Sequence, residues 1–123
     1  MEEITSDAVY SLDLPFPLGI VEGDRVYLSG RTARDPETGE PISGVVAQTE
    51  RILTDIERLL AEVGLTVDDL VTVTIYLKNM GDIGDVNAVY AEHLSEPYPA
   101  RSAVEVSDLA ADFDIEIEAV AAR

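Results

Sequence analysis

The amino-acid sequence predicts an α+β domain in which one sheet carries two helices on the same face. Segments with the two-residue period of strands and segments with the period of helices follow one another in the order strand, strand, helix, strand, helix, strand, strand. No internal repeat or low-complexity linker interrupts the 123 residues, of which 46% are hydrophobic. A chain of this size and composition forms one core, so we expect a single domain over residues 1–123.

The first half of the chain predicts a strand, a turn and a long helix. Residues 25–29 place Val26 and Leu28 on one side of a short strand, and the turn sequence Asp-Pro-Glu-Thr-Gly follows at 35–39. Over residues 45–63 apolar side chains recur every three or four positions, which predicts a helix that stops at Gly64. The expected inward positions of this helix are Val45, Val46, Ile52, Leu53, Ile56, Leu59, Leu60 and Val63.

The second half predicts a strand, a helix and two closing strands. Residues 70–77 are β-branched and alternate. Their apolar face is expected to hold Val71, Val73, Ile75 and Leu77, and the other face Thr72, Thr74 and Tyr76. The helix at 83–94 has Asp82 as its expected N-cap, and the segments 101–106 and 113–121 alternate as strands.

The face of the sheet away from the helices is predicted to be half polar. The last strand turns Glu116, Glu118 and Val120 to this face, opposite Phe113, Ile115, Ile117 and Ala119. Because both helices are used on the other side, this face is either wet or an interface between chains.

The charge balance excludes two classes of partner. The chain has 25 acidic and 8 basic residues, for a formal net charge of −17. Nucleic acids and anionic membrane surfaces both require a basic face, and the basic residues here form no run. The acid excess indicates either a highly soluble surface or adaptation to a high-salt cytoplasm, where screening makes self-repulsion tolerable.

The sequence features that report on cellular location indicate the cytoplasm. No apolar run is long enough to cross a bilayer, and the start MEEITSD is acidic where a secretory signal would need basic residues and an apolar stretch. Cys is absent, so disulfides, thiolate metal ligands and a thiolate nucleophile are excluded. We expect a cytoplasmic protein.

Several short motifs together resemble the RidA (YjgF-like) family of reactive-intermediate deaminases, from about residue 15 to the end. They are Ser29-Gly30, Thr38-Gly39, Gln48-Thr49, Asn87 with Tyr90, Tyr98-Pro99-Ala100-Arg101, and Ile115-Glu116-Ile117-Glu118-Ala119. The resemblance implies a chorismate-mutase-like fold that assembles as a homotrimer, with active sites in clefts between subunits. That assembly would cover the half-polar face.

The resemblance also implies a reaction: hydrolysis of 2-aminoacrylate and related enamine or imine acids to a 2-oxo acid and ammonia, as in a 2-iminobutanoate/2-iminopropanoate deaminase. Arg101 would hold the substrate carboxylate through two parallel hydrogen bonds. The alternative for Arg101 is an ordinary strand arginine that neutralises Glu105 or Glu118. Glu116 would be the acid/base, with Glu118 on the same face as the competing candidate.

Other positions are carried over from the family with smaller roles. Ser29 and Gly30 would border the pocket, the backbone of Ala103 would help to bind the carboxylate, and Asn87 would reach a neighbouring subunit's site or be an ordinary surface amide. His93 is expected to be a lone histidine on a helix surface. No cofactor is expected, and no metal site is expected because the sequence has no second His, no Cys and no spaced carboxylate loop.

Departures from the family pattern leave a second function open. Phe16 stands where the family's deaminases carry Tyr, so a hydroxyl that could contact substrate is missing. Arg31 follows Ser29-Gly30 in place of Gln, and Arg34 comes soon after; both would suit a more anionic substrate or pair with Asp35 and Glu37. The alternative to the enzyme is a non-catalytic small-carboxylate binder or regulator, and ribonuclease activity, known for some relatives, is disfavoured by the charge.

Overall fold

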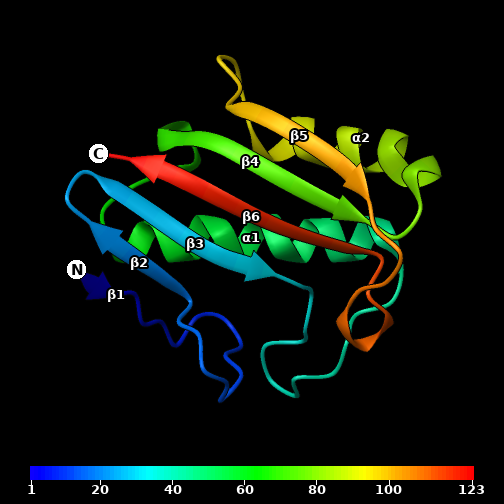
Figure 1. Cartoon of the computed structure of the whole chain (residues 1–123), viewed down its shortest axis with the longest axis horizontal. Helices are drawn as coiled ribbons and strands as arrows, with labels where there is room; N and C mark the ends of the chain where they lie inside the picture. Colours follow the sequence, from blue (N-terminus) through cyan, green and yellow to red (C-terminus); the bar gives the residue numbers. More distant parts are fainter.

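The computed structural model describes residues 1–123 as one six-stranded sheet with two α-helices behind it (Figure 1). The strands are β1 Glu2–Glu3, β2 Gly19–Glu22, β3 Arg25–Arg31, β4 Leu70–Leu77, β5 Ala100–Glu105 and β6 Ile115–Ala122. The helices are α1 Val45–Glu62 and α2 Ile83–His93, with short 3-10 turns at Val67–Asp69, Met80–Asp82 and Ala110–Asp112. The predicted fold class is confirmed.

The sheet has the strand order β1-β2-β3-β6-β4-β5. All neighbours are antiparallel except β4 and β5, which run parallel because α2 forms the crossover between them. The last strand, β6, therefore lies in the middle of the sheet between β3 and β4. The edge strand β5 pairs only with β4, so one of its edges is open.

The core lies between the sheet and α1, as the helical period predicts. Ile52, Ile56, Leu59 and Leu60 are fully buried on α1, and Ile75, Ile115 and Ile117 are fully buried on the facing strands. Each such side chain contributes about 1.5–3 kcal/mol through removal from water. Val46, expected to point inward, is 47% exposed. Gln48 is buried instead, and its side chain exchanges hydrogen bonds with Asp114.

A bulge at the start of β4 changes which residues face the core. The pairing of β4 with β6 shifts between Leu70 and Thr72, so Val71 is an extra residue on the β4 side. Leu70 is buried, whereas Val71 is 43% exposed. The prediction that Val71 shares the buried face with Val73 is therefore wrong, and the alternation holds only from Thr72 onward.

The C-terminal end of α1 and the N-terminal end of α2 are capped in different ways. Gly64 has φ of +76°, and the N–H groups of Gly64 and Leu65 donate to the carbonyl oxygens of Ala61 and Leu60. These bonds satisfy the end of α1 as predicted. Asp82, expected as the N-cap of α2, makes no capping hydrogen bond with its side chain. Asn79 provides the side-chain cap one turn earlier, at the 3-10 turn that leads into α2.

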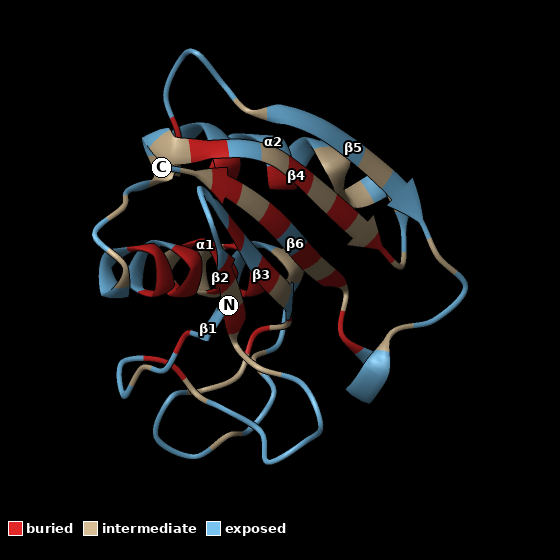
Figure 2. Ribbon diagram, turned by 60° about the vertical axis from the view of Figure 1, so that its left-hand side comes forward, coloured by how far each residue is buried: buried red, intermediate tan, exposed pale blue.

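The face of the sheet opposite the helices is uncovered, and Figure 2 shows buried and less buried residues alternating along β4 and β6. Glu118 is exposed on this face, Thr74, Tyr76, Glu116 and Val120 are partly buried, and Tyr27 on β3 is 47% exposed. We refer to this surface as the open face. No helix is long and apolar enough to span a bilayer.

Candidate functional site

The register of the sheet places Arg101 and Glu116 on opposite faces. Arg101 pairs with Val73, whose side chain is buried under the helices, and paired residues in a ladder share a face. Glu116 pairs with Tyr76 on the open face. A single chain therefore does not bring the two predicted catalytic side chains together.

Arg101 lies in a cleft of about 350 Å³ between β5 and α2. The cleft is lined by Asn87, Tyr90, Ala91, Tyr98, Pro99 and Arg101. The guanidinium carbon of Arg101 is 5.0 Å from the centre of the Tyr90 ring, and the Tyr90 and Tyr98 rings are 6.3 Å apart. Burial raises the pKa of Tyr90, an effect that the charge of Arg101 opposes. The structure thus brings Asn87 and Arg101 to one cleft.

Arg101 makes no ion pair in the structure. Glu105 accepts a hydrogen bond from the Met80 N–H, and Glu118 accepts one from the Tyr76 hydroxyl. The alternative in which Arg101 neutralises Glu105 or Glu118 is therefore wrong for the single chain. Its guanidinium, stacked on an aromatic ring and exposed at the edge of the sheet, is free to bind a planar anion.

The backbone of Ala103 faces the open edge of β5. The Val106 N–H donates to the Leu77 carbonyl of β4, so the period of the strand turns the N–H groups of Ala103 and Arg101 away from β4. The Ala103 side chain packs against the core. An outward N–H two residues from a free guanidinium is available as a second donor, and carboxylate binding by the Ala103 backbone stays a prediction.

Glu116 lies half-buried over Gly30 on the open face. A Cβ atom added to Gly30 would be 2.5 Å from Oε2 of Glu116, so only glycine allows this approach. Ser29 and Gly30 are the residues at which the pairing of β3 with β6 becomes irregular, between Leu28 and Arg31. The structure therefore brings Gly30 and Glu116 together, and Ser29 precedes Gly30 in β3.

The environments of Glu116 and Glu118 differ. Burial raises the pKa of Glu116, and the neighbouring charge of Glu118 raises it further. Glu116 accepts no hydrogen bond, whereas the Tyr76 hydroxyl lies 2.5 Å from Oε1 of the exposed Glu118. A carboxyl without donors and with a raised pKa is better suited to proton transfer near neutral pH, so the geometry favours Glu116 over Glu118.

Phe16, in the segment before β2, borders a cavity that Gly30 also lines. Its ring is 52% exposed, and together with Tyr10, Gly30 and Arg31 it borders a cavity of about 50 Å³. Phe16 and Gly30 therefore line the same space. The ring offers an apolar wall there and no hydrogen-bond donor.

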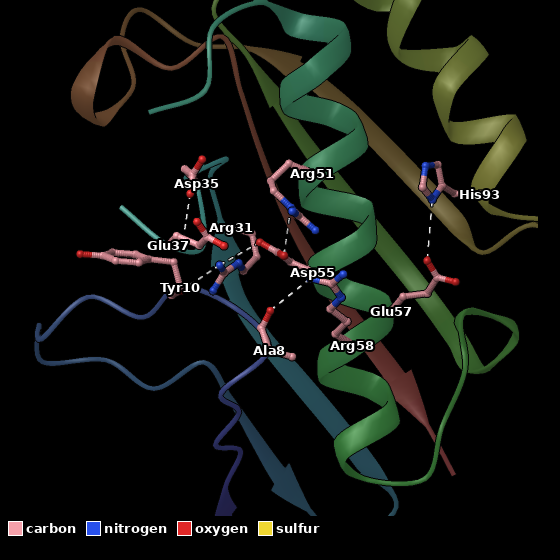
Figure 3. Close-up of polar contacts among 10 residues, drawn as sticks. All are labelled: Ala8, Tyr10, Arg31, Asp35, Glu37, Arg51, Asp55, Glu57, Arg58 and His93. Carbon is pink, nitrogen blue, oxygen red and sulfur yellow. Dashed lines mark hydrogen bonds and ion pairs between the residues drawn. The ribbon is translucent and has the colours of Figure 1, made fainter. Parts of the chain in front are cut away.

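Arg31 points toward α1, away from the open face (Figure 3). Its Nη2 lies 3.0 Å from Oδ2 of Asp55 and donates to the Tyr10 carbonyl oxygen. Arg51 Nε is 3.3 Å from the other Asp55 oxygen. The expected pairing of Arg31 with Asp35 or Glu37 is wrong, because the Asp35 carboxylate accepts from the Glu37 and Thr38 N–H groups. A substrate contact by Arg31 stays a prediction.

Two further side chains differ from expectation. Arg34 donates to the Gly39 carbonyl oxygen and stacks on the buried Phe113 ring, so it closes the loop before α1. His93 is not a lone surface residue: its ring is largely buried between the helices, with Nε2 3.2 Å from Glu50 and Nδ1 3.8 Å from Glu57. No cluster of three or more potential metal ligands is present.

The raised pKa of Glu116 leads to a stability prediction for Glu116→Gln. The folded-state pKa of this carboxyl exceeds the unfolded value, so its ionisation destabilises the fold above that value. The neutral substitution is expected to raise the free energy of unfolding at pH 7 by up to about 1 kcal/mol, because water partly screens a half-exposed group. Urea titrations should show that the gain disappears below the unfolded pKa, where Glu116 is protonated in both states.

Glu92→Gln is the matched control for this measurement, because Glu92 is exposed on α2 and makes no ion pair. It should leave the free energy of unfolding nearly unchanged at both pH values. A loss of stability in Glu116→Gln at pH 7 would contradict the prediction.

Known proteins match this chain over most or all of its length. The family described as Endoribonuclease L-PSP matches residues 11–123. A protein of Escherichia coli K12 named 2-iminobutanoate/2-iminopropanoate deaminase is 38% identical over 112 residues, which cover 89% of this chain and 88% of that protein. Relatives from two Pyrococcus species, at similar identity, are described only as RutC family proteins.

Solved structures show the same fold. RidA from a Psychrobacter species matches with a TM-score of 0.96 and 32% identity over 100% of both chains. E. coli TdcF, solved with bound serine, matches with a TM-score of 0.93 and 31% identity over 100% of this chain and 99% of that one.

Proposed function

The chain belongs to the Endoribonuclease L-PSP family, that of the RidA and YjgF proteins, and we propose that it is a deaminase that hydrolyses 2-aminoacrylate-type enamine and imine acids to 2-oxo acids and ammonia. The observation that carries the proposal is the unpaired Arg101 in a chain of net charge −17. A cation that no acid of the chain neutralises, next to an outward backbone N–H, is suited to a small carboxylate. The E. coli relative supports the reaction, and TdcF with bound serine supports the size of the ligand.

The carboxylate would be held at β5. Two guanidinium N–H groups of Arg101 would donate to its two oxygens, and the Ala103 N–H would add a third donor. Asn87, in the same cleft, would contact the polar end of the ligand. This arrangement fixes the orientation of the C–N bond and leaves the proton transfers to another group.

Glu116 would provide those proton transfers. The protonated Glu116 carboxyl first gives its proton to the methylene carbon of the enamine, which becomes an iminium ion. The Glu116 carboxylate then removes a proton from water as the water oxygen bonds to the iminium carbon, and it passes this proton to nitrogen. When the C–N bond breaks, ammonia leaves, the carbonyl forms, and the hydroxyl proton goes to the carboxylate, which restores the protonated Glu116. The raised pKa of Glu116 supports this role, because a stronger base accepts the proton from water more readily.

The complete site would need two chains, because Arg101 and Glu116 lie on opposite faces. We propose that the open faces of three copies meet in a homotrimer and that each cleft combines the Arg101 side of one chain with the Ser29, Gly30 and Glu116 side of the next. The uncovered Tyr27 and the partly buried Val120 support an interface at this face. We propose that the trimer works in the cytoplasm, in agreement with the absence of Cys.

One observation favours the second candidate, a non-catalytic carboxylate binder. Phe16 borders the same cavity as Gly30 and has no hydroxyl, so fewer groups would be available there to position a water molecule. Cleavage of RNA remains disfavoured, because the net charge of −17 repels phosphate and Arg101 is the one cation of its cleft.

The deaminase proposal predicts the outcome of one assay. With 2-aminoacrylate generated in situ by a pyridoxal-phosphate lyase, wild type should accelerate pyruvate and ammonia release. Arg101→Ala should lower kcat/KM by roughly 100-fold through loss of two charge-assisted hydrogen bonds, and Glu116→Ala should lower it by roughly 100-fold or more through loss of the base.

Arg25→Ala is the matched control, because Arg25 is an exposed strand arginine that makes no ion pair. Its rate should equal that of wild type. If wild type fails to accelerate release but still binds 2-oxobutanoate in calorimetry, with binding lost in Arg101→Ala, the binder is correct and the deaminase is wrong. Equal rates in wild type and Arg101→Ala would refute the assignment of Arg101.

A further inference from the structure

The open face holds an interaction beside Glu116 that the proposed reaction has not used. Tyr76 lies directly across from Glu116 in the ladder of β4 and β6, and Glu118 is the next residue of β6 on the same face. The Tyr76 hydroxyl does not bond to Glu116. It reaches the diagonal neighbour, with a distance of 2.5 Å to Oε1 of Glu118.

We propose that Tyr76 is a positioning residue for the proposed deaminase, whose hydroxyl clamps the Glu118 carboxylate beside Glu116, so that Glu116 works next to a fixed negative charge and without a hydrogen bond of its own. This inference rests on the proposed function, because it gives Glu116 the role of acid/base. In this role neither Tyr76 nor Glu118 contacts the substrate, and both act through Glu116.

Two carboxylates on one face of a strand cannot both be stabilised by one donor. The Tyr76 hydroxyl donates to Glu118, so it holds that carboxylate in place and leaves Glu116 without a donor. The same bond raises the pKa of Tyr76, which therefore remains a donor throughout the neutral range. Glu116, which has no such donor, is repelled by the negative charge of Glu118. Besides burial, the charge of Glu118 is the cause that raises the pKa of Glu116.

The other elements around Glu116 add little charge on this face. β3 contributes Ser29 and Gly30, and β5 contributes Ser102 and Val104. Tyr27 of β3 lies farther along, opposite Val120. At the other end, Lys78 is paired with Asp112, and Asp114 is bonded to Gln48. In the proposed trimer, Arg101 of a second copy would be the cation facing Glu116, and it would oppose the effect of Glu118.

Two variants separate the effect of the Tyr76 hydroxyl from that of the Glu118 charge, and a third is a control. Tyr76→Phe removes the hydroxyl and keeps the ring. Glu118→Gln removes the charge and keeps an acceptor for Tyr76. Tyr27→Phe is the matched control, because it removes a hydroxyl from an exposed tyrosine of the same face that makes no side-chain hydrogen bond. All three changes are nearly isosteric, so the fold should be kept.

Two readouts are needed: the pH dependence of kcat/KM, and the titration of the Glu116 carboxyl carbon by NMR, assigned with Glu116→Gln. In Glu118→Gln and in Tyr76→Phe, the Glu116 midpoint and the acid limb of the rate profile should both move to lower pH. The rate on the plateau should fall by roughly two- to five-fold, because a weaker base removes the proton from water less readily. Tyr27→Phe should match wild type in both readouts.

The two readouts distinguish failure of this inference from failure of the deaminase proposal. If wild type shows no turnover, the proposed function is wrong, and with it the catalytic role of the pair. If wild type turns over substrate but the Glu116 midpoint is the same in wild type, Tyr76→Phe and Glu118→Gln, the deaminase stands and the role of Tyr76 is wrong. An equal shift in Tyr27→Phe would also overturn it, because the effect would then not be local.

Discussion

Chains carrying Arg101→Ala and chains carrying Glu116→Ala should each be inactive alone, and refolding them together in equal amounts should recover about a quarter of wild-type activity. The reason is the placement of the two side chains on opposite faces of one sheet. In the proposed trimer each cleft takes Arg101 from one chain and Glu116 from the next. With random assembly, half of the clefts receive an intact arginine and half of those also receive an intact glutamate.

The control uses a chain that carries both substitutions. Mixed with either single variant, it cannot form an intact cleft, so no activity should return. Native mass spectrometry must show that mixed oligomers form. Mixed oligomers without recovered activity would mean that each site is built from one chain, and the proposed division of the site would be wrong.

Asp55→Ala should lower the free energy of unfolding by about 3–5 kcal/mol, the loss typical of removing one partner of a buried ion pair. Asp55 is 2% exposed on its side chain, and it accepts a hydrogen bond from Arg31, whose side chain is 10% exposed. Burial raises the pKa of Asp55 while Arg31 and Arg51 oppose this, so the pair itself contributes little. The loss arises because the buried charge of Arg31 is left without a carboxylate partner and keeps only its hydrogen bond to the Tyr10 carbonyl oxygen. Urea unfolding at pH 7 measures it.

Two further variants test this explanation. Glu57→Ala, at an exposed position of the same helix, should cost no more than about 1 kcal/mol. Replacing both partners, with Arg31→Met and Asp55→Leu, should return most of the stability, because no buried charge remains unpaired. If the double variant is as unstable as Asp55→Ala, packing rather than charge explains the loss.

The sequence was sufficient for features that depend on local periodicity. Helix α1, its stop at Gly64 and the inward faces of β4 and β6 follow from spacings of two, three or four residues. The bulge at Val71 was missed because it depends on how β4 pairs with β6, a strand from the far end of the sequence. The Arg31–Asp55 pair was missed for the same reason, because the helical period of apolar residues in α1 does not identify a polar pair with β3.

The candidate site shows the same limit. The residue types and motifs identified Arg101, Glu116 and Gly30, and the structure adds that Gly30 is where Glu116 lies. That Arg101 and Glu116 face opposite ways depends on β5 running parallel to β4 in a particular register. Alternation in β5 cannot show this, because only Ala103 and Val106 of the segment 101–106 are even partly buried.

The division of the site between two faces links ligand binding to mass action. If a carboxylate is held well only where two chains meet, the ligand stabilises the assembled state and shifts the association equilibrium toward it. Activity then rises more than proportionally with the concentration of chains. For a protein whose copies repel one another at −17 charges each, the ligand and dissolved salt would act in the same direction. Substrate accumulation would thus assemble the catalyst that removes it.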